Sequence, residues 1–361
     1  MSPTEGEIQV QATTSQLEAD GSRVDDLALN EAEMQALALL FTAEKDGESA
    51  DHAALDKACE ERYWIYKEDL SAAFPALLER GFIEGDENGY RLTDEGRPKA
   101  EYCIKARSSS HHYHYYHFWQ AAFDSKAHTQ LCDRAFGKDL CQDGMVDMAA
   151  LEDVIARLDI GPGKRLFDLG CGVGMISEHI SDVTGASVVG LDYAPEAVKA
   201  ALDRTVEKRS RLDFVQSDMN DLNLEPASFD AAMSLDTLYW AVDLEATVAK
   251  LAEAVKPGGQ ICIFMMQGPW DNDPSGQVPA ERTDLGQVLA KLGLRYEAHD
   301  YTEQNKAFWN RNYQAAVDLL DTFRAEGNEF IALSLIKESE EEFLPAIVAD
   351  KMTRYLYQIW R

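Results

Sequence analysis

The residues best suited to do chemistry form a glycine-rich turn between two acids. Asp168 opens the segment Asp-Leu-Gly-Cys-Gly-Val-Gly, in which Gly170, Gly172 and Gly174 alternate with larger residues. Glycine has no Cβ atom, so such a backbone can approach a ligand closely and adopt positive φ angles. Asp192 ends the next apolar run and can accept hydrogen bonds from both hydroxyls of a ribose. The pattern therefore predicts a site for a nucleoside.

Two short apolar runs and one helical pattern surround this turn. Leu166-Phe167 indicates the end of a buried strand, and Ser187 to Leu191 indicates the next strand. Between them Ile176, Ile180 and Val183 recur at helical spacing. The result is a β-α-β unit with glycines at the strand-to-helix turn. The spacing differs from the Gly-x-Gly-x-x-Gly of dinucleotide-binding enzymes, and the Lys-Ser/Thr pair of a phosphate-binding loop is missing from the sequence.

The segment resembles motif I of the class I S-adenosylmethionine (SAM) dependent methyltransferases. Later segments agree with that family in order and spacing: Ser217-Asp218-Met219 beside the adenine, residues 229–234 as a fourth strand, and residues 256–259 as the turn before a fifth. The resemblance covers about residues 150–267. It implies a Rossmann-like α/β sheet with helices on both faces, and SAM as cofactor with S-adenosylhomocysteine as product. It also implies these cofactor-binding residues: Asp168, Gly170, Cys171, Gly172, Gly174, Asp192, Tyr193, Ser217, Asp218, Met219 and Leu235.

The first third of the chain predicts a smaller, mainly helical domain. Residues 1–28 are polar and acidic and predict a disordered tail. Helical patterns from Leu29, over 51–58 and over 67–80 precede a hairpin around Asn88-Gly89, so residues 29–105 resemble a winged-helix domain. The third helix has three acids and two bases, which disfavours DNA binding. In methyltransferases that resemble the plant O-methyltransferase group such a domain serves dimerisation, so we expect a homodimer.

Residues 106–150 predict linker helices with a dense group of histidines and aromatic residues. His114 and His117 are candidate general bases, and Tyr115 and Tyr116 are candidate substrate contacts. The helix could equally pack its aromatic residues against both domains. A metal site is a third interpretation, but no carboxylate or cysteine completes the set nearby, so no metal is expected.

The methyl acceptor is expected beyond the fourth strand. Ligands of open α/β sheets lie at the carboxyl ends of the strands, so Asp236 and Tyr239 are predicted as catalytic residues and Trp240 as a substrate contact. Tyr239 and Trp240 could instead pack the following helix. An insertion over about 268–330, within a domain spanning 151–361, predicts further substrate contacts at Trp270, Trp309 and Tyr313.

Composition limits the classes of partner. The chain has 361 residues, 45% of them hydrophobic, and a formal net charge of −30, which argues against nucleic acids and anionic membrane surfaces. Six scattered cysteines indicate reduced thiols in a cytoplasm. No apolar run is long enough to span a bilayer. A small molecule is therefore the expected acceptor.

The identity of the accepting atom stays open at this stage. Residues 126–148 resemble bacterial methyltransferases of small sulfur or nitrogen compounds, and the acidic composition, which fits a marine source, favours sulfur over nitrogen. The alternatives are an O-methyltransferase that uses a histidine base, a SAM-sensing winged-helix regulator, and a protein that holds SAM as a structural ligand.

Overall fold

The computed structural model describes residues 29–361 except 64–66, 107–109, 242 and 269–276. The side chains of 105–114 and 116 also lie outside the described part. The predicted tail, Trp270 and the side chains of His114 and Tyr116 therefore have no structural outcome. The chain divides into two compact units, and the boundary between Phe118 and Trp119 falls inside helix α6 (Ser110–Ala122).

The first unit contains the predicted helices and hairpin. Its elements are α2 (Glu31–Asp46), α3 (His52–Tyr63), α4 (Ala73–Glu79), β1 (Ile83–Asp86), β2 (Gly89–Leu92) and α5 (Gly96–Ala106). Asn30 caps α2, and its side chain accepts from Glu33 N while the Glu33 side chain accepts from Asn30 N. The expectation of one helix over 67–80 is wrong at its start, because Asp69 Oδ1 accepts from Ser71 N in a turn before α4.

The second unit is built on a seven-stranded sheet. The strands are β3 (Arg165–Leu169), β4 (Ser187–Asp192), β5 (Leu212–Gln216), β6 (Phe229–Leu235), β7 (Val255–Gln267), β8 (Arg295–Asp300) and β9 (Thr353–Trp360). Their order is β5-β4-β3-β6-β7-β9-β8, and only β9 runs antiparallel to its neighbours. Leu169 pairs with Leu191 and Ser234, so the carboxyl ends of β3, β4 and β6 lie level. This register brings the predicted site residues to one edge of the sheet.

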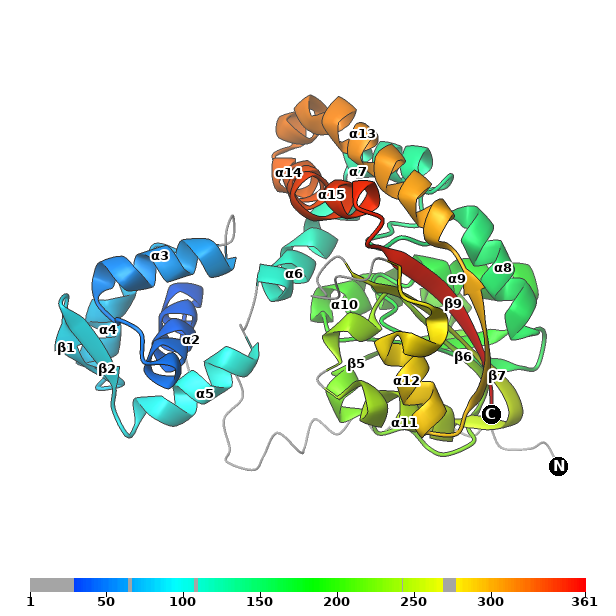
Figure 1. The fold of residues 1–361 in the computed structure, drawn as a ribbon, viewed down its shortest axis with the longest axis horizontal. Coiled ribbons are helices and arrows are strands. Elements are labelled where there is room, and N and C mark those ends of the chain that lie inside the picture. Colours follow the sequence, from blue (N-terminus) through cyan, green and yellow to red (C-terminus); the bar gives the residue numbers. More distant parts are fainter. Residues whose placement is uncertain (1–28, 64–66, 107–109, 242, 269–276) are drawn as a thin grey trace. The chain divides into compact units, whose positions relative to one another are not determined.

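Helices cover both faces of this sheet, as predicted (Figure 1). Helices α8 (Met148–Leu158), α9 (Met175–Thr184) and α10 (Pro195–Arg204) pack on one face, with Leu151, Ile180 and Val198 in that core. Helices α11 (Leu244–Ala254) and α12 (Asp284–Lys291) pack on the other, with Leu251 and Leu289 in theirs. The sequence also predicts helices over 148–158 and 195–208; α8 has the first range, whereas α10 ends at Arg204.

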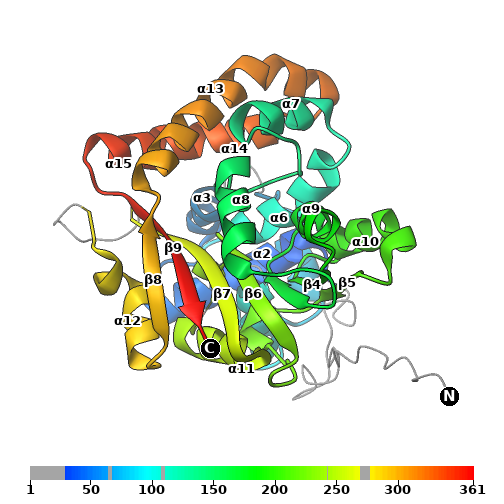
Figure 2. The ribbon, with the colours of Figure 1, turned by 90° about the vertical axis from the view of Figure 1, so that its right-hand side faces the viewer.

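A helical layer is inserted between β8 and β9. It consists of α13 (Thr302–Glu326), α14 (Glu329–Glu338) and α15 (Leu344–Val348), with a π-helical turn at Ser339–Phe343. Figure 2 shows these helices together with α7 (Lys126–Ala135), which packs on α13. The sequence predicts one long helix here, over 307–326, which corresponds to α13; it does not predict α14 and α15, because they lack a clear amphipathic stripe. Among the described residues no helix is long and apolar enough to cross a membrane.

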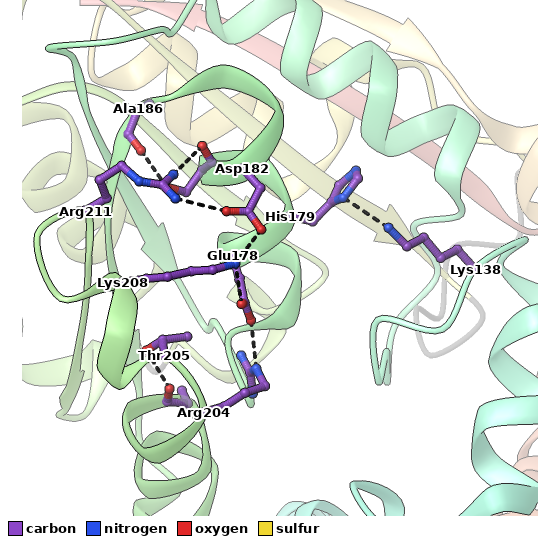
Figure 3. A network of polar contacts seen from close by, with 11 residues as sticks. Lys138, Glu178, His179, Asp182, Ala186, Arg204, Thr205, Lys208 and Arg211 are labelled. Atoms are coloured by element: carbon purple, nitrogen blue, oxygen red, sulfur yellow. Dashed lines mark hydrogen bonds and ion pairs between the residues drawn. The ribbon is translucent and has the colours of Figure 1, made fainter.

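Ion pairs tie α9 to the elements that follow it (Figure 3). Glu178 on α9 contacts Arg204 at 2.7 Å and Lys208 at 2.8 Å. Asp182, one turn later, contacts Lys208 at 2.6 Å and Arg211 at 3.0 Å. Such a network resists small rotations of α9 more than isolated surface pairs would. It therefore holds the helix that begins directly after the glycine turn.

Candidate cofactor and acceptor site

The glycine turn is fixed to the sheet by backbone hydrogen bonds. Gly170 N and Cys171 N both donate to Leu191 O, at 2.8 and 3.0 Å. Gly170, Gly172 and Gly174 have φ angles of 82°, 53° and 70°. All three lie in the left-handed region that favours glycine. The turn therefore requires the glycines at these positions.

Close neighbours add a second reason for these glycines. A Cβ atom on Gly170 would lie 2.4 Å from Thr237 Cγ2, and one on Gly172 would lie 2.8 Å from the ring of Trp119. A Cβ atom on Gly174 would lie 2.4 Å from the ring of Phe214. The indole of Trp119, a residue that the sequence interpretation did not select, thus lies against the turn.

Asp192 lies at the end of β4 and faces the glycine turn. Its Oδ2 accepts from Gly172 N at 2.8 Å, and its Oδ1 accepts from Ala194 N at 3.0 Å. Burial raises the pKa of this carboxyl group, although the backbone donors oppose the shift. Each carboxylate oxygen can accept a second hydrogen bond. Asp192 can therefore still accept two hydroxyls of a ribose, as the sequence predicts.

Asp168 is the second buried acid of the site. It lies on β3 and accepts a short hydrogen bond from Ser177 Oγ at the start of α9. Burial raises its pKa to about 7, a shift that the Ser177 hydroxyl opposes and the charge of Asp192 increases. A cation bound beside this carboxyl group would favour the ionised form and lower the pKa again. Asp168 is therefore suited to a positively charged ligand.

The remaining residues predicted to bind the cofactor lie at the carboxyl ends of β4, β5 and β6. Ser217 N donates to Asp192 O at 3.0 Å, which holds the segment after β5 against β4. Asp218 Oδ1 accepts from Asn220 N at 2.8 Å and caps a short helical turn. Tyr193, Met219 and Leu235 are half-buried beside these ends. The structure thus brings the predicted cofactor residues to one edge of the sheet.

Asp236 is part of a buried ion pair. It follows β6 with a φ angle of 57°, and its oxygens accept from Arg354 Nε at 3.1 Å and Arg354 Nη2 at 2.6 Å. The arginine is 1% exposed and the aspartate 7%. Met145 N donates to Oδ2 at 3.1 Å, and Tyr239 Oη donates to Oδ1 at 3.3 Å. Each carboxylate oxygen thus already accepts two hydrogen bonds, and this geometry favours a positioning role over the predicted catalytic role.

Tyr239 and Trp240 differ in their surroundings. Tyr239 Oη accepts from Met266 N at 2.7 Å and thereby links the residues after β6 to the end of β7. Burial raises the pKa of this phenol, although the guanidinium of Arg354 opposes the shift, so the group stays protonated at neutral pH and does not act as a base. Trp240 is 38% exposed, and its carbonyl accepts from Asn220 Nδ2 at 3.4 Å. Tyr239 therefore connects the end of β6 to the end of β7, while the side chain of Trp240 is accessible to solvent.

Helix α13 buries three side chains that carry polar atoms, Asn305, Trp309 and Asn312, and Asn305 contacts the end of β7. Trp309 stacks on Phe343 with ring centroids 3.5 Å apart, and Tyr313 Oη donates to Glu340 at 2.7 Å. Asn305 Nδ2 lies 2.9 Å from Met352 Sδ and 3.4 Å from Met266 Sδ. Among the described residues no hydrogen-bond partner is found for three buried atoms of these side chains: Asn305 Oδ1, Trp309 Nε1 and Asn312 Oδ1.

Of the four candidate residues on the histidine-rich helix α6, the structure describes the side chains of two, Tyr115 and His117. Tyr115 is half-buried and His117 is exposed. The roles that the sequence predicts for both residues remain predictions.

Several positioning residues escaped the sequence interpretation. Thr237 Oγ1 donates to Leu169 O at 2.9 Å and shares a hydrogen bond with Ser234 Oγ at 2.5 Å. Arg354 pairs with a residue 118 positions earlier. One feature of the sequence indicates this pair: Arg354 is a charged residue near the start of a mostly apolar strand. A charge buried in such a strand needs a partner.

Comparisons with known proteins agree with this geometry. A family model described as "Methyltransferase domain" matches residues 167–263. The ubiquinone biosynthesis O-methyltransferase of Xanthomonas campestris pv. campestris (strain B100) is 38% identical over 149 residues, which are 41% of this chain and 56% of that protein. The protein of the same name from Xanthomonas oryzae pv. oryzae (strain PXO99A) is 31% identical over 180 residues, or 46% and 69% of the two chains. The chain thus spans little more than half of the first of these relatives.

Solved structures share the fold at low identity. A phosphoethanolamine N-methyltransferase 2 of Haemonchus contortus, in complex with phosphomonomethylethanolamine and S-adenosylhomocysteine, has a TM-score of 0.55 at 18% identity over 68% of this chain and 60% of that chain. The [4+2]-cyclase SpnF has a TM-score of 0.51 at 18% identity over 67% and 95%. Because these two proteins differ in reaction, the likeness shows the fold alone. Fold, glycine turn, family model and relatives together place the chain in the family of class I SAM-dependent methyltransferases.

Proposed function

We propose that this protein transfers the methyl group of SAM to a hydroxyl oxygen of a small hydroxylated molecule. The observation that carries the proposal is the pair of buried acids, Asp168 and Asp192, on either side of the glycine turn. The names of the Xanthomonas relatives support oxygen as the accepting atom. The sulfur acceptor favoured by the sequence finds no specific support in them.

The cofactor half of the site follows from these two acids. Asp192 would accept the ribose hydroxyls through the free lone pairs of its two oxygens. Asp168, whose pKa burial raises to about 7, would stabilise the positively charged end of the cofactor once ionised. SAM itself supplies an electrophilic methyl group, so the protein has to orient the acceptor and exclude water.

The acceptor half lies near the carboxyl end of β7 and under α13. Asn305 Oδ1 and Asn312 Oδ1 can each accept a hydrogen bond, and Trp309 Nε1 can donate one. Leaving such buried groups without partners costs about 1–3 kcal/mol each, so a bound molecule that pairs with them gains affinity. A molecule with several hydroxyl or carbonyl groups meets this need, whereas a thiol forms only weak hydrogen bonds.

Proton removal from the acceptor is the remaining step. The oxygens of Asp236 are engaged by Arg354, and the raised pKa of Tyr239 keeps its phenol protonated, so neither side chain is free to accept the proton. His114 and His117 remain the proposed bases, as the sequence suggests. A phenolic hydroxyl, more acidic than an aliphatic one, would demand the least of such a base.

The test combines binding with turnover. SAM and S-adenosylhomocysteine are titrated calorimetrically, and matched panels of hydroxylated aromatics, thiols and amines are screened by mass spectrometry for the gain of one CH2. Turnover confined to hydroxylated compounds supports the proposal, and turnover confined to thiols or amines refutes the choice of oxygen. An Asn312→Leu variant should raise the acceptor KM while the SAM Kd stays unchanged. Absence of SAM binding would refute the cofactor assignment itself.

We further propose that the first unit serves dimerisation and not DNA binding. Helix α4 contains no Lys or Arg within its bounds, so it offers no cationic surface to a phosphate backbone. Light scattering of the purified full chain should give twice the mass of one chain, and a random DNA duplex should not bind at physiological salt. A monomer that binds DNA would instead favour the SAM-sensing regulator.

A further inference from the structure

Three side chains of different types converge at the junction of α7 and the loop that follows it. Nδ1 and Nε2 of His128 each lie 3.7 Å from Cys132 Sγ. One carboxylate oxygen of Asp139 lies within 4.8 Å of one ring nitrogen of His128 and of Cys132 Sγ. Cys141 Sγ lies 4.0 Å from His128 Nδ1. His128, Cys132 and Cys141 are at most 4% exposed, so the group faces the interior.

The local sequence explains this convergence. His128 and Cys132 are four residues apart on α7 and therefore lie on one face of that helix. Asp139 and Cys141 follow in the loop, where Asp139 Oδ1 accepts from Cys141 N at 2.8 Å. Cys141 has a φ angle of 48°, which is uncommon for a residue other than glycine. This strained conformation directs a second thiol toward the histidine.

We propose that His128, Cys132, Asp139 and Cys141 form a binding site for a zinc ion. Zinc prefers four ligands drawn from thiolate, imidazole and carboxylate groups, at about 2.3 Å from sulfur and about 2.0–2.1 Å from nitrogen or oxygen. A tetrahedron with these bonds has sulfur–nitrogen edges of about 3.6 Å. The observed separations of 3.7 and 4.0 Å are close to that value.

The position of the site indicates what the ion does. The loop 136–147 continues from the cluster to Met145, whose N–H donates to Asp236 Oδ2 at 3.1 Å. Met148 N, at the start of α8, donates to Phe136 O at 2.9 Å and closes the same loop. A bound zinc would therefore fix the loop that supports the residues after β6. The proposal assigns a structural ion, distinct from the methyl-transfer chemistry, and it goes beyond the function proposed above.

The first test measures metal in the purified full chain after removal of any affinity tag. Mass spectrometry of the metals should find about one zinc per chain, and His128→Ala and Cys132→Ser should each lose most of it. Cys262→Ser is the matched control, because Cys262 is an equally buried thiol on β7 outside the cluster, and it should keep its zinc. Equal zinc content in wild type, His128→Ala and Cys132→Ser would overturn the proposal and point to another site.

The second test needs no variant and so does not depend on how the variants fold. Wild-type chain is stripped with a chelator and titrated with cobalt(II). Binding through two thiolates should give a sulfur-to-cobalt charge-transfer band and release two protons per ion, one from each cysteine. Absence of both signals in stripped chain that still binds SAM would overturn the zinc site and leave the proposed function intact.

Discussion

The ion pair between Arg354 and Asp236 provides the sharpest test of the site geometry. Replacement of Arg354 by Met removes the guanidinium but keeps a long apolar side chain over the ring of Phe264, which the guanidinium now faces at 4.1 Å. In the part of the chain that the structure describes, the buried carboxylate of the variant keeps two donors, the N–H of Met145 and the hydroxyl of Tyr239. Its cost therefore measures what the pair contributes.

The size of the effect follows from burial. Removing one member of a buried ion pair typically costs about 3–5 kcal/mol, because the remaining charge loses its partner. Two charge-assisted hydrogen bonds are lost here, at about 1.5–3 kcal/mol each, which gives a similar range. Asp236→Asn should cost a comparable amount, and asparagine tolerates the positive φ of that position. The double variant should cost less than the sum of the two by at least about 2 kcal/mol.

Urea unfolding followed by tryptophan fluorescence measures these free energies. Five of the six tryptophans lie in residues 119–361, so the signal reports mainly on the unit that contains the pair. Arg295→Met on β8 is the matched control, because that side chain is 75% exposed and its loss should leave the midpoint almost unchanged. A cost below about 1 kcal/mol for Arg354→Met, or strictly additive effects in the double variant, would refute the reasoning.

Three further predictions concern the cofactor and can be measured by calorimetric titration with SAM. Asp192→Ala removes the proposed acceptors of the ribose hydroxyls, so Kd should rise at least about tenfold, and an unchanged Kd would contradict that role. Gly174→Ala places a Cβ 2.4 Å from Phe214 at a φ of 70°, so binding should be lost, whereas normal affinity would mean that the turn is not strained. Because burial raises the pKa of Asp168 to about 7 and a cationic ligand lowers it, affinity should fall about tenfold from pH 8 to pH 6. Asp168→Asn should give a flat profile between these pH values.

Much of the fold could be predicted because its signals are local. The capping box at Asn30, the hairpin around Asn88-Gly89 and the full extent of α8 follow from the chemistry of a few neighbouring residues. The glycine turn is equally local, since positive φ at Gly172 is a property of one residue. The predicted start of the third helix was wrong because a competing local hydrogen bond was overlooked. Asp69 accepts from Ser71 in a turn, so α4 begins later than predicted. Helices α14 and α15 were missed because neither has a strong apolar period.

The sequence by itself therefore determined the family, the cofactor and the residues that form the glycine turn. Only the tertiary structure decided that Asp236 is held by Arg354, 118 residues away, and that α13 brings Asn305 to Met266 at the end of β7. It also decided that His128 meets Cys141. The physical reason is the range of the interactions: turn conformation and helical period depend on neighbours in the chain. A buried charge, in contrast, takes its partner from whichever strand packing brings within hydrogen-bond distance.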